Sequence, residues 1–219
     1  MKFNHLEGYE SVTLPVETIN GKRYYVTPDG NKYPSVTTVT GMHSAKWVAK
    51  WRANVGAEVA DKISGQAAGR GTRYHNMQED FINNIDITEK LDKATPLDKM
   101  MFNQTRELTE KIGDIYMLEG SLYSDDLAIA GRVDCIAGKV SVIDFKTSTK
   151  PKTPSQIKGY FMQETAYAKM FEERHGVDID RIVTIVSVEN TGESQLFVEN
   201  PNNWIDQLLS LRSQYKTEY

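Results

Sequence analysis

Apolar runs in the second half of the chain predict strands, with one longer helical run between them. The strand-like runs are short and rich in β-branched and aromatic residues. The helical run starts at Pro154, and proline is favoured in the first turn of a helix. The predicted order is a strand at 116–124, two strands within 131–152, a helix at 154–173, strands at 181–188 and 194–200, and a closing helix to about residue 215.

The first half of the chain predicts a hairpin followed by helices. The hairpin turn is Pro28-Asp29-Gly30. Trp47 and Trp51 stand one helical turn apart, which is more typical of a core contact than of a base-stacking platform. Glycines between 65 and 75 predict a helix break or a close helix approach. The predicted elements are the hairpin at 22–33, a short helix from Pro34-Ser35 through Val39, a helix at 45–56, a longer helical run from Gly56 through Ile82, and an amphipathic helix at 97–112.

This order of elements predicts one α/β domain over residues 1–219. We expect a mixed central sheet flanked by helices at 116–199, with a crossover helix inside that segment. The hairpin and an N-terminal helical layer would occupy 1–115. A C-terminal helix would occupy 200–219.

The composition is that of an ordinary globular protein, with 39% hydrophobic and 26% charged residues. The sequence contains no stretch of about 18 apolar residues, so we expect no membrane-spanning helix. The N-terminal segment resembles neither a secretory signal nor a transit peptide. The single cysteine, Cys135, excludes an internal disulfide and is expected to be a packed core thiol. These features predict a cytoplasmic protein.

Charge is distributed unevenly along the chain. The net charge of −4 argues weakly against a nucleic acid partner. However, residues 46–75 hold six basic residues against two acidic ones, and residues 139–160 hold five against one. Phosphate binding needs a local basic surface rather than a basic protein. These segments are therefore compatible with DNA binding, as well as with ordinary solvated faces.

The segment GRVDCIAGKVSVIDFKTSTKPK, residues 131–152, carries charges inside two apolar strands. Asp134 lies on the first strand. Asp144 and Lys146 share one face of the second, because side chains two residues apart in a strand point the same way. Strand interiors are poor places for carboxylate and ammonium groups. The three charges therefore indicate a functional site.

The connection at Gly138-Lys139 decides whether Asp134 joins that face. A two-residue loop would pair Asp134 with Ile143 and turn its side chain to the opposite face. A three-residue loop or a bulge would place it opposite Asp144. The apolar pattern does not decide, because both faces of a central strand are buried. The chemistry favours the three-residue loop, for which glycine supplies the left-handed conformation.

Two carboxylates and an ammonium at one point form either a buried salt bridge or a metal site. A salt bridge to Lys146 leaves one carboxylate unpaired, which is costly when it is buried. A divalent cation bridging Asp134 and Asp144 removes this difficulty, and a small set of oxygen ligands suits Mg²⁺ or Mn²⁺. Water bound to such a cation beside a lysine is placed for hydrolysis. The residues therefore favour a hydrolytic site.

The arrangement D-x9-D-x-K across two strands resembles the PD-(D/E)XK nuclease superfamily, with Ile143 in place of the motif's opening proline. Further segments resemble its RecB-like branch and the phage and mitochondrial genome maintenance exonucleases, over about residues 24–170. They are YPSVTTVT (33–40), WRANVGAEVA (51–60), the His-bearing helix GRGTRYHNMQEDF (69–81), the acidic strand LEGSLYSDDLAIAGRVD (118–134) and the Q-x3-Y motif QETAY (163–167).

The resemblance implies a role for each matching residue. Asp134 and Asp144 would ligate the metal, with the carbonyl of Phe145 as a main-chain ligand. Lys146 would orient or deprotonate the attacking water and offset charge on the phosphate. The other implied roles are metal ligation by His75 and Glu119, positioning of the scissile strand by Gln163 and Tyr167, and DNA contacts by Arg70, Arg73, Thr147, Ser148, Lys150 and Lys152.

The predicted function is a metal-dependent DNA exonuclease that acts on single strands or DNA ends, with Mg²⁺ or Mn²⁺ as cofactor. Exonucleases of the family thread a free strand under a helical arch, which residues 84–115 or the N-terminal helices would form. One alternative is an endonuclease of the same superfamily with the same catalytic residues. Another is an inactive DNA-binding module, against which the intact triplet argues. The resemblance also implies a phage protein in a bacterial host cell, or a bacterial relative.

Overall fold

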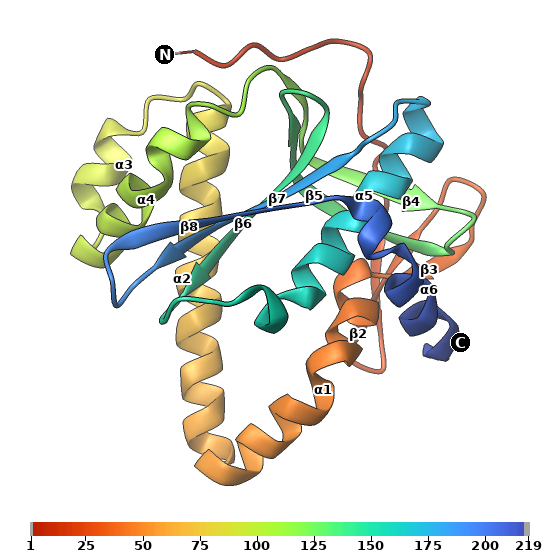
Figure 1. The fold of residues 1–219 in the computed structure, drawn as a ribbon, viewed down its shortest axis with the longest axis horizontal. Coiled ribbons are helices and arrows are strands. Elements are labelled where there is room, and N and C mark those ends of the chain that lie inside the picture. The colour runs from red at the N-terminus through yellow and green to blue at the C-terminus, as the bar shows by residue number, and fades with distance from the viewer. Residues whose placement is uncertain (1, 217–219) are drawn as a thin grey trace.

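The computed structural model describes residues 2–216, which form an α/β arrangement with two sheets (Figure 1). The larger sheet is mixed, in the order β4-β5-β6-β7-β8, with β6 parallel to β7 and the other neighbours antiparallel. The smaller sheet is antiparallel. The strands are β1 Val16–Ile19, β2 Lys22–Val26, β3 Lys32–Pro34, β4 Ile115–Ser124, β5 Ile129–Ala137, β6 Ser141–Ser148, β7 Arg181–Val188 and β8 Glu193–Glu199.

Helices cover both faces of the larger sheet, so the predicted mixed sheet flanked by helices is confirmed. The parallel strands β6 and β7 are joined through α5, as expected for a crossover connection. The helices are α1 Val36–Val55, α2 Ala57–Ile82, α3 Thr88–Lys93, α4 Pro96–Thr109, α5 Lys158–His175 and α6 Ile205–Gln214, with short 3₁₀ turns η1 Pro154–Gln156 and η2 Pro201–Asn203.

The two N-terminal helices are longer and more regular than the sequence predicts. The short helix ending at Val39 and the helix at 45–56 are one helix, α1. Ser35 caps it, because the Ser35 hydroxyl accepts a hydrogen bond from the Thr38 amide at 3.1 Å. Of the two alternatives predicted for the glycines between 65 and 75, the helix break is wrong, since α2 runs through that segment without interruption.

The first part of α2 and most of α1 extend beyond the sheet as a helical hairpin, which Figure 1 shows below the sheet. In α1, buried residues occur only in the first turns, at Val36, Val39 and Thr40. In the first ten residues of α2, only Ala60 is buried. The hairpin therefore has little packing to hold it against the rest of the molecule.

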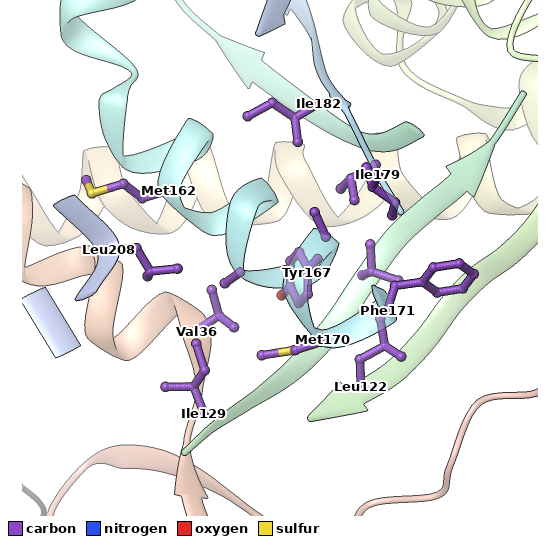
Figure 2. Close-up of a cluster of buried hydrophobic side chains, with 14 of the residues drawn as sticks. Val36, Leu122, Ile129, Met162, Tyr167, Met170, Phe171, Ile179, Ile182 and Leu208 are labelled. Atoms are coloured by element: carbon purple, nitrogen blue, oxygen red, sulfur yellow. The ribbon is translucent and has the colours of Figure 1, made fainter. Parts of the chain in front are cut away.

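Each face of the larger sheet carries its own buried cluster. On one face, the sheet packs against α5, α1 and α6, and Figure 2 shows Tyr167, Met170 and Phe171 of α5 at the centre of this cluster. On the other face, Tyr74 of α2 and Met101 of α4 pack against strand residues. The sheet thus lies between two helical layers, and its central strands are buried on both faces.

Cys135 of β5 belongs to the second of these clusters and is fully buried. Burial raises the pKa of its thiol, with a smaller contribution from the nearby carboxylate of Asp134. The expectation of a packed core thiol is therefore confirmed. Among residues 2–216, no helix is long and apolar enough to cross a membrane.

Candidate functional site

The β5–β6 hairpin has the three-residue connection that the chemistry favours. Its pairs run from Ala137–Ser141 to Cys135–Ile143, so residues 138–140 form the loop and the same register places Asp134 opposite Asp144. Gly138 has φ 65°, the left-handed conformation expected for it. The predicted register is confirmed.

Beyond the Cys135–Ile143 pair, the backbone pairing of β5 and β6 ends, and the Asp134 side chain accepts the next hydrogen bond from β6. The Phe145 amide donates a hydrogen bond to Oδ2 of Asp134 at 3.0 Å. Nδ1 of His75, on α2, lies 3.4 Å from the same carboxylate oxygen. Asp134 is thus fixed by β6 on one side and approached by the helix on the other.

Asp144 is held by two side chains on its own sheet face. Nζ of Lys146 lies 2.5 Å from both carboxylate oxygens, and Nε2 of Gln163 on α5 donates to Oδ1 at 3.1 Å. The Lys146 ammonium also lies 5.3 Å from the ring centre of Tyr160. The face shared by Asp144 and Lys146 is therefore as predicted, and Gln163 anchors the pair to the crossover helix.

Three donor groups from three elements converge beside this pair. A nitrogen of His75 and carboxylate oxygens of Glu119 and Asp134 all lie within 4.8 Å of one another. Glu119 follows Leu118, which pairs with Cys135, so Glu119 and Asp134 occupy the same row of the sheet. Asp144 stands outside this group, engaged by Lys146. Glu119, which was the least supported ligand in the sequence analysis, therefore belongs to this group with His75, whereas Asp144 does not.

The side chains of the site are buried enough to shift their pKa values. Burial lowers the pKa of His75 to about 4, and the positive charge of Lys146 acts in the same direction. Burial raises the pKa of Glu119 to about 7, assisted by the charge of Asp134. At neutral pH His75 is therefore a neutral imidazole, which is the form that can donate a lone pair to a metal.

The two aspartates and the lysine form one charge system. Burial raises the pKa of Asp134 and raises that of Asp144 to about 6, while Lys146 opposes both shifts. Burial lowers the pKa of Lys146, but the two carboxylates outweigh this and hold it above its usual value. The lysine therefore remains an ammonium, and the carboxylates carry more negative charge than it neutralises.

Asp134 and Lys146 line a cleft of about 450 Å³, whereas Asp144 is buried behind them. Lys146, Gln163 and Tyr167 lie in its wall together with the three donor residues. Tyr167 is buried and lies over Gly131, where an added Cβ would come within 2.9 Å of the Tyr167 hydroxyl oxygen. Glycine at 131 thus lets this ring reach the site.

Two predicted DNA-contact residues, Arg70 and Arg73, form ion pairs with other residues of the chain and do not line the cleft. Arg70 forms an ion pair with Glu189 at 2.6 Å and donates to Thr147 and Thr149. Arg73 pairs with Asp98 at 2.8 Å. These partners lie far away in sequence, so the basic cluster at 46–75 gave no sign of them.

The remaining residues of that set lie in or after the end of β6. Thr147 accepts from Nε of Arg70, and Ser148 is buried and donates to the Lys150 carbonyl at 2.6 Å. Lys150 is exposed, and the backbone of Lys152 is fixed by Gln195 at 2.7 and 3.0 Å. DNA contact by any of the six residues stays a prediction.

Sequence reasoning missed two acidic residues. Glu79 lies one helical turn after His75 and lines the same cleft, so the spacing on α2 could have identified it. Glu164, beside Gln163 in the QETAY segment, is fully buried and accepts a hydrogen bond from Thr184. Burial and the charge of Asp144 raise its pKa well above the usual value. Nothing in its spacing distinguished it from a surface glutamate.

Part of the chain is similar to two curated exonucleases, whereas no protein-family model matches it. It is 28% identical over 130 residues to mitochondrial genome maintenance exonuclease 1 of Xenopus tropicalis, covering 54% of this chain and 37% of that protein. It is 25% identical over 133 residues to the human protein of the same name, covering 56% and 38%. This similarity supports a nuclease relationship, although the match spans less than two fifths of those relatives.

Among solved structures, that of SSO0001 is similar at a TM-score of 0.38 and 19% identity, over 53% of this chain and 55% of that one. So low a score carries no argument about the fold.

Proposed function

We propose that this chain is a divalent-metal-dependent deoxyribonuclease of the PD-(D/E)XK type, acting as an exonuclease on single-stranded DNA or DNA ends. The observation that carries the proposal is the convergence of His75, Glu119 and Asp134 beside the Asp144–Lys146 pair in one cleft. The named exonuclease relatives add support for the nuclease class.

The donor set fits a small divalent cation. His75 is neutral at neutral pH, and burial together with the charge of Asp134 raises the pKa of Glu119, so a positive ion beside these carboxylates would be stabilising. Two carboxylates and one imidazole suit Mn²⁺ or Mg²⁺. His75, Glu119 and Asp134 would hold the ion, with Asp144 and the Phe145 carbonyl as the further ligands proposed from the family. When bound, the cation supplies positive charge for the phosphate and lowers the pKa of water.

Lys146 has the properties of a phosphate-binding group rather than a base. The carboxylates of Asp144 and Asp134 keep it protonated, so it offers a positive charge and N–H donors to a scissile phosphate in the cleft. Asp144 orients the ammonium, and Gln163 orients Asp144. Of the two roles inferred for this lysine, offsetting phosphate charge is the one we propose.

Cleavage of an end-labelled single-stranded oligonucleotide tests the proposal. We expect cleavage with Mg²⁺ or Mn²⁺ and no cleavage with chelator. Asp134→Asn should lower the cleavage rate at least about a hundredfold, because removing one group that stabilises charge in a transition state typically lowers an enzyme's rate by about that factor. Asp126→Asn is the matched control, since Asp126 is an exposed residue in the β4–β5 turn. An Asp134→Asn variant as active as Asp126→Asn would contradict the site.

A closed circular single strand separates exonuclease from endonuclease. An exonuclease leaves the circle intact while degrading a linear strand of the same sequence, whereas an endonuclease cuts both. Binding of the linear strand without cleavage under any metal condition would instead support an inactive DNA-binding module.

A further inference from the structure

Trp47 is exposed where the sequence spacing favoured a core contact. The side chain lies on the projecting part of α1 with 67% of its residue surface accessible. Its ring is parallel to that of Trp51, with an interplanar angle of 2° and centres 6.3 Å apart. Exposed aromatic faces of this kind are platforms on which unpaired bases stack.

Trp47 forms one wall of a second cavity of about 450 Å³. This groove, here called the α1 groove, lies between α1 and the segment that joins β6 to α5. None of its lining residues is acidic. They are Thr40, His43, Ser44, Trp47, Val48, Lys152, Ser155, Gln156, Ile157, Gly159 and Tyr160.

The charge around the α1 groove suits a polyanion. Helix α1 carries Lys46, Lys50 and Arg52 and has no acidic residue, and only Arg52 of these is in an ion pair within the described chain. Lys152 also lines the groove, and among residues 2–216 its hydrogen bonds are made by its backbone, with Gln195, so its ammonium group is in no ion pair there. A strand seated here would find lysines for its phosphates and an aromatic face for a base.

The groove and the catalytic cleft meet at one side chain. Tyr160 lines the groove, and its ring lies 5.3 Å from the ammonium of Lys146, which lines the cleft. Gln163 of the cleft is one turn further along the same helix. A chain of nucleotides leaving the cleft past Lys146 would therefore enter the groove.

We infer that the α1 groove is a subsite for single-stranded DNA, in which a base stacks on Trp47 and a phosphate contacts Lys152. This inference rests on the proposed function and adds the position and chemistry of the strand outside the cleft. Two other occupants of the α1 groove fit less well. A protein segment packed against Trp47 would not need the lysine charges, and duplex DNA would offer no unpaired base for stacking.

Binding of oligothymidylate of two and twelve nucleotides, measured by fluorescence anisotropy in Ca²⁺ or chelator without cleavage, tests the stacking contact. We expect Trp47→Ala to weaken binding of the twelve-nucleotide strand at least about fivefold, the smallest usual effect of losing one stacked base. The loss should be smaller for the dinucleotide, which is too short to fill both cavities. Trp47→Phe should restore most of the binding, and Trp47→Leu should not.

Ile63→Ala is the matched control, because Ile63 is 45% exposed on α2 of the same hairpin but does not line the groove. It should bind like the wild type. Equal loss in Ile63→Ala and Trp47→Ala, or equal rescue by phenylalanine and leucine, would overturn the stacking contact. Circular dichroism of each variant checks the fold.

The phosphate contact has its own measurement. Lys152→Gln should reduce the slope of log affinity against log salt by about 0.7, the value expected for one phosphate on a single strand. Lys139→Gln, in the β5–β6 loop and outside the groove, should leave that slope unchanged. An unchanged slope in Lys152→Gln would overturn this contact.

The proposed function and the subsite fail in different ways. If the wild type neither binds nor cleaves single strands, the proposed function is wrong. If it cleaves them but Trp47→Ala binds the twelve-nucleotide strand as the wild type does, only the subsite is wrong.

Discussion

Glu119 occupies a backbone conformation that few residues adopt. Its φ is 49°, in the left-handed region, although it lies inside strand β4. Such a conformation costs on the order of 1–3 kcal/mol in a residue other than glycine. The strain brings its carboxylate beside Asp134 and His75, where burial and like charge also disfavour ionisation. Local backbone energy and electrostatics are therefore both unfavourable at this position without a bound cation.

Glu119→Gln should raise the melting temperature in chelator at pH 8. The pKa of Glu119 is about 7 in the folded protein against 4.5 when unfolded, so its contribution to stability is complete below pH 4.5 and is lost as pH rises through 7. A shift of this size corresponds to roughly 3 kcal/mol. The charge of Arg132, which is 2.9 Å from Glu119, lowers this pKa, so its favourable contribution is already included in the net shift.

Thermal unfolding of wild type and variant at pH 5 and pH 8 checks this. At pH 5 the carboxyl is protonated, so the two proteins should have similar melting temperatures. A variant less stable than the wild type at pH 8 would show that the glutamate charge is favourable in the folded state.

At the scale of residues, local chemistry could be predicted and long-range pairing could not. Asp134, Asp144 and Lys146 were predictable because charges inside apolar strands have no purely structural reason. The engagement of Arg70 by Glu189 was not, since 119 positions separate the two residues. The left-handed backbone conformation of Glu119 could not be predicted from the sequence either, because glutamate normally avoids this conformation.

Among the elements, the β5–β6 loop fixes the register on which the site depends. Gly138 donates its amide to the Asp114 carbonyl at 2.8 Å, and an added Cβ there would lie 2.3 Å from the Ile112 carbonyl oxygen. The loop is therefore held closely against the chain that enters β4. This contact allows no side chain at residue 138.

Gly138→Ala should destabilise the protein more than Gly192→Ala. Both glycines have φ near 66°, at 65° and 67°, but an added Cβ at Gly192 meets nothing within 4 Å. Gly192→Ala should cost about 1 kcal/mol from the left-handed backbone alone, and Gly138→Ala at least about 2 kcal/mol because of the added clash. Urea unfolding measures both. Equal losses would show that the loop can move away from Ile112.

The elements that were mispredicted are those without a buried face to define them. Helix α1 continues past Gly41, and α2 past Gly65, because an exposed glycine weakens a helix by only about 1 kcal/mol. Helix α3 was not predicted, and it has six residues, none of them buried. Strands β4 to β7 and helix α5 were predictable because their apolar content follows from their burial on the sheet, whereas β1, which has no buried residue, was not predicted.

For the whole molecule, the candidate metal group joins α2, β4 and β5 through His75, Glu119 and Asp134. Ligation would therefore connect the N-terminal helices to the sheet. A cation that binds only the folded state stabilises the chain as a unit.

Mn²⁺ should raise the melting temperature of the wild type. At a hundredfold excess over its Kd the gain is about 2.7 kcal/mol, or roughly 5–10 °C for a chain of this size. The shift should fall by at least half in His75→Ala and in Asp134→Asn, because each removes a ligand. Asp126→Asn should retain the full shift. Differential scanning fluorimetry measures it, and no shift in the wild type would contradict metal binding at this site.

The burial of Cys135 has a practical consequence. Because it is the single thiol of the chain and is fully enclosed with a raised pKa, the native protein offers no fast-reacting sulfur to a maleimide. A cysteine introduced at an exposed position such as Ile63 would then be the one site that takes a fluorophore, with no native residue to remove first. The helical hairpin could be followed by energy transfer to a dye on the oligonucleotide, which would report the path of the strand directly.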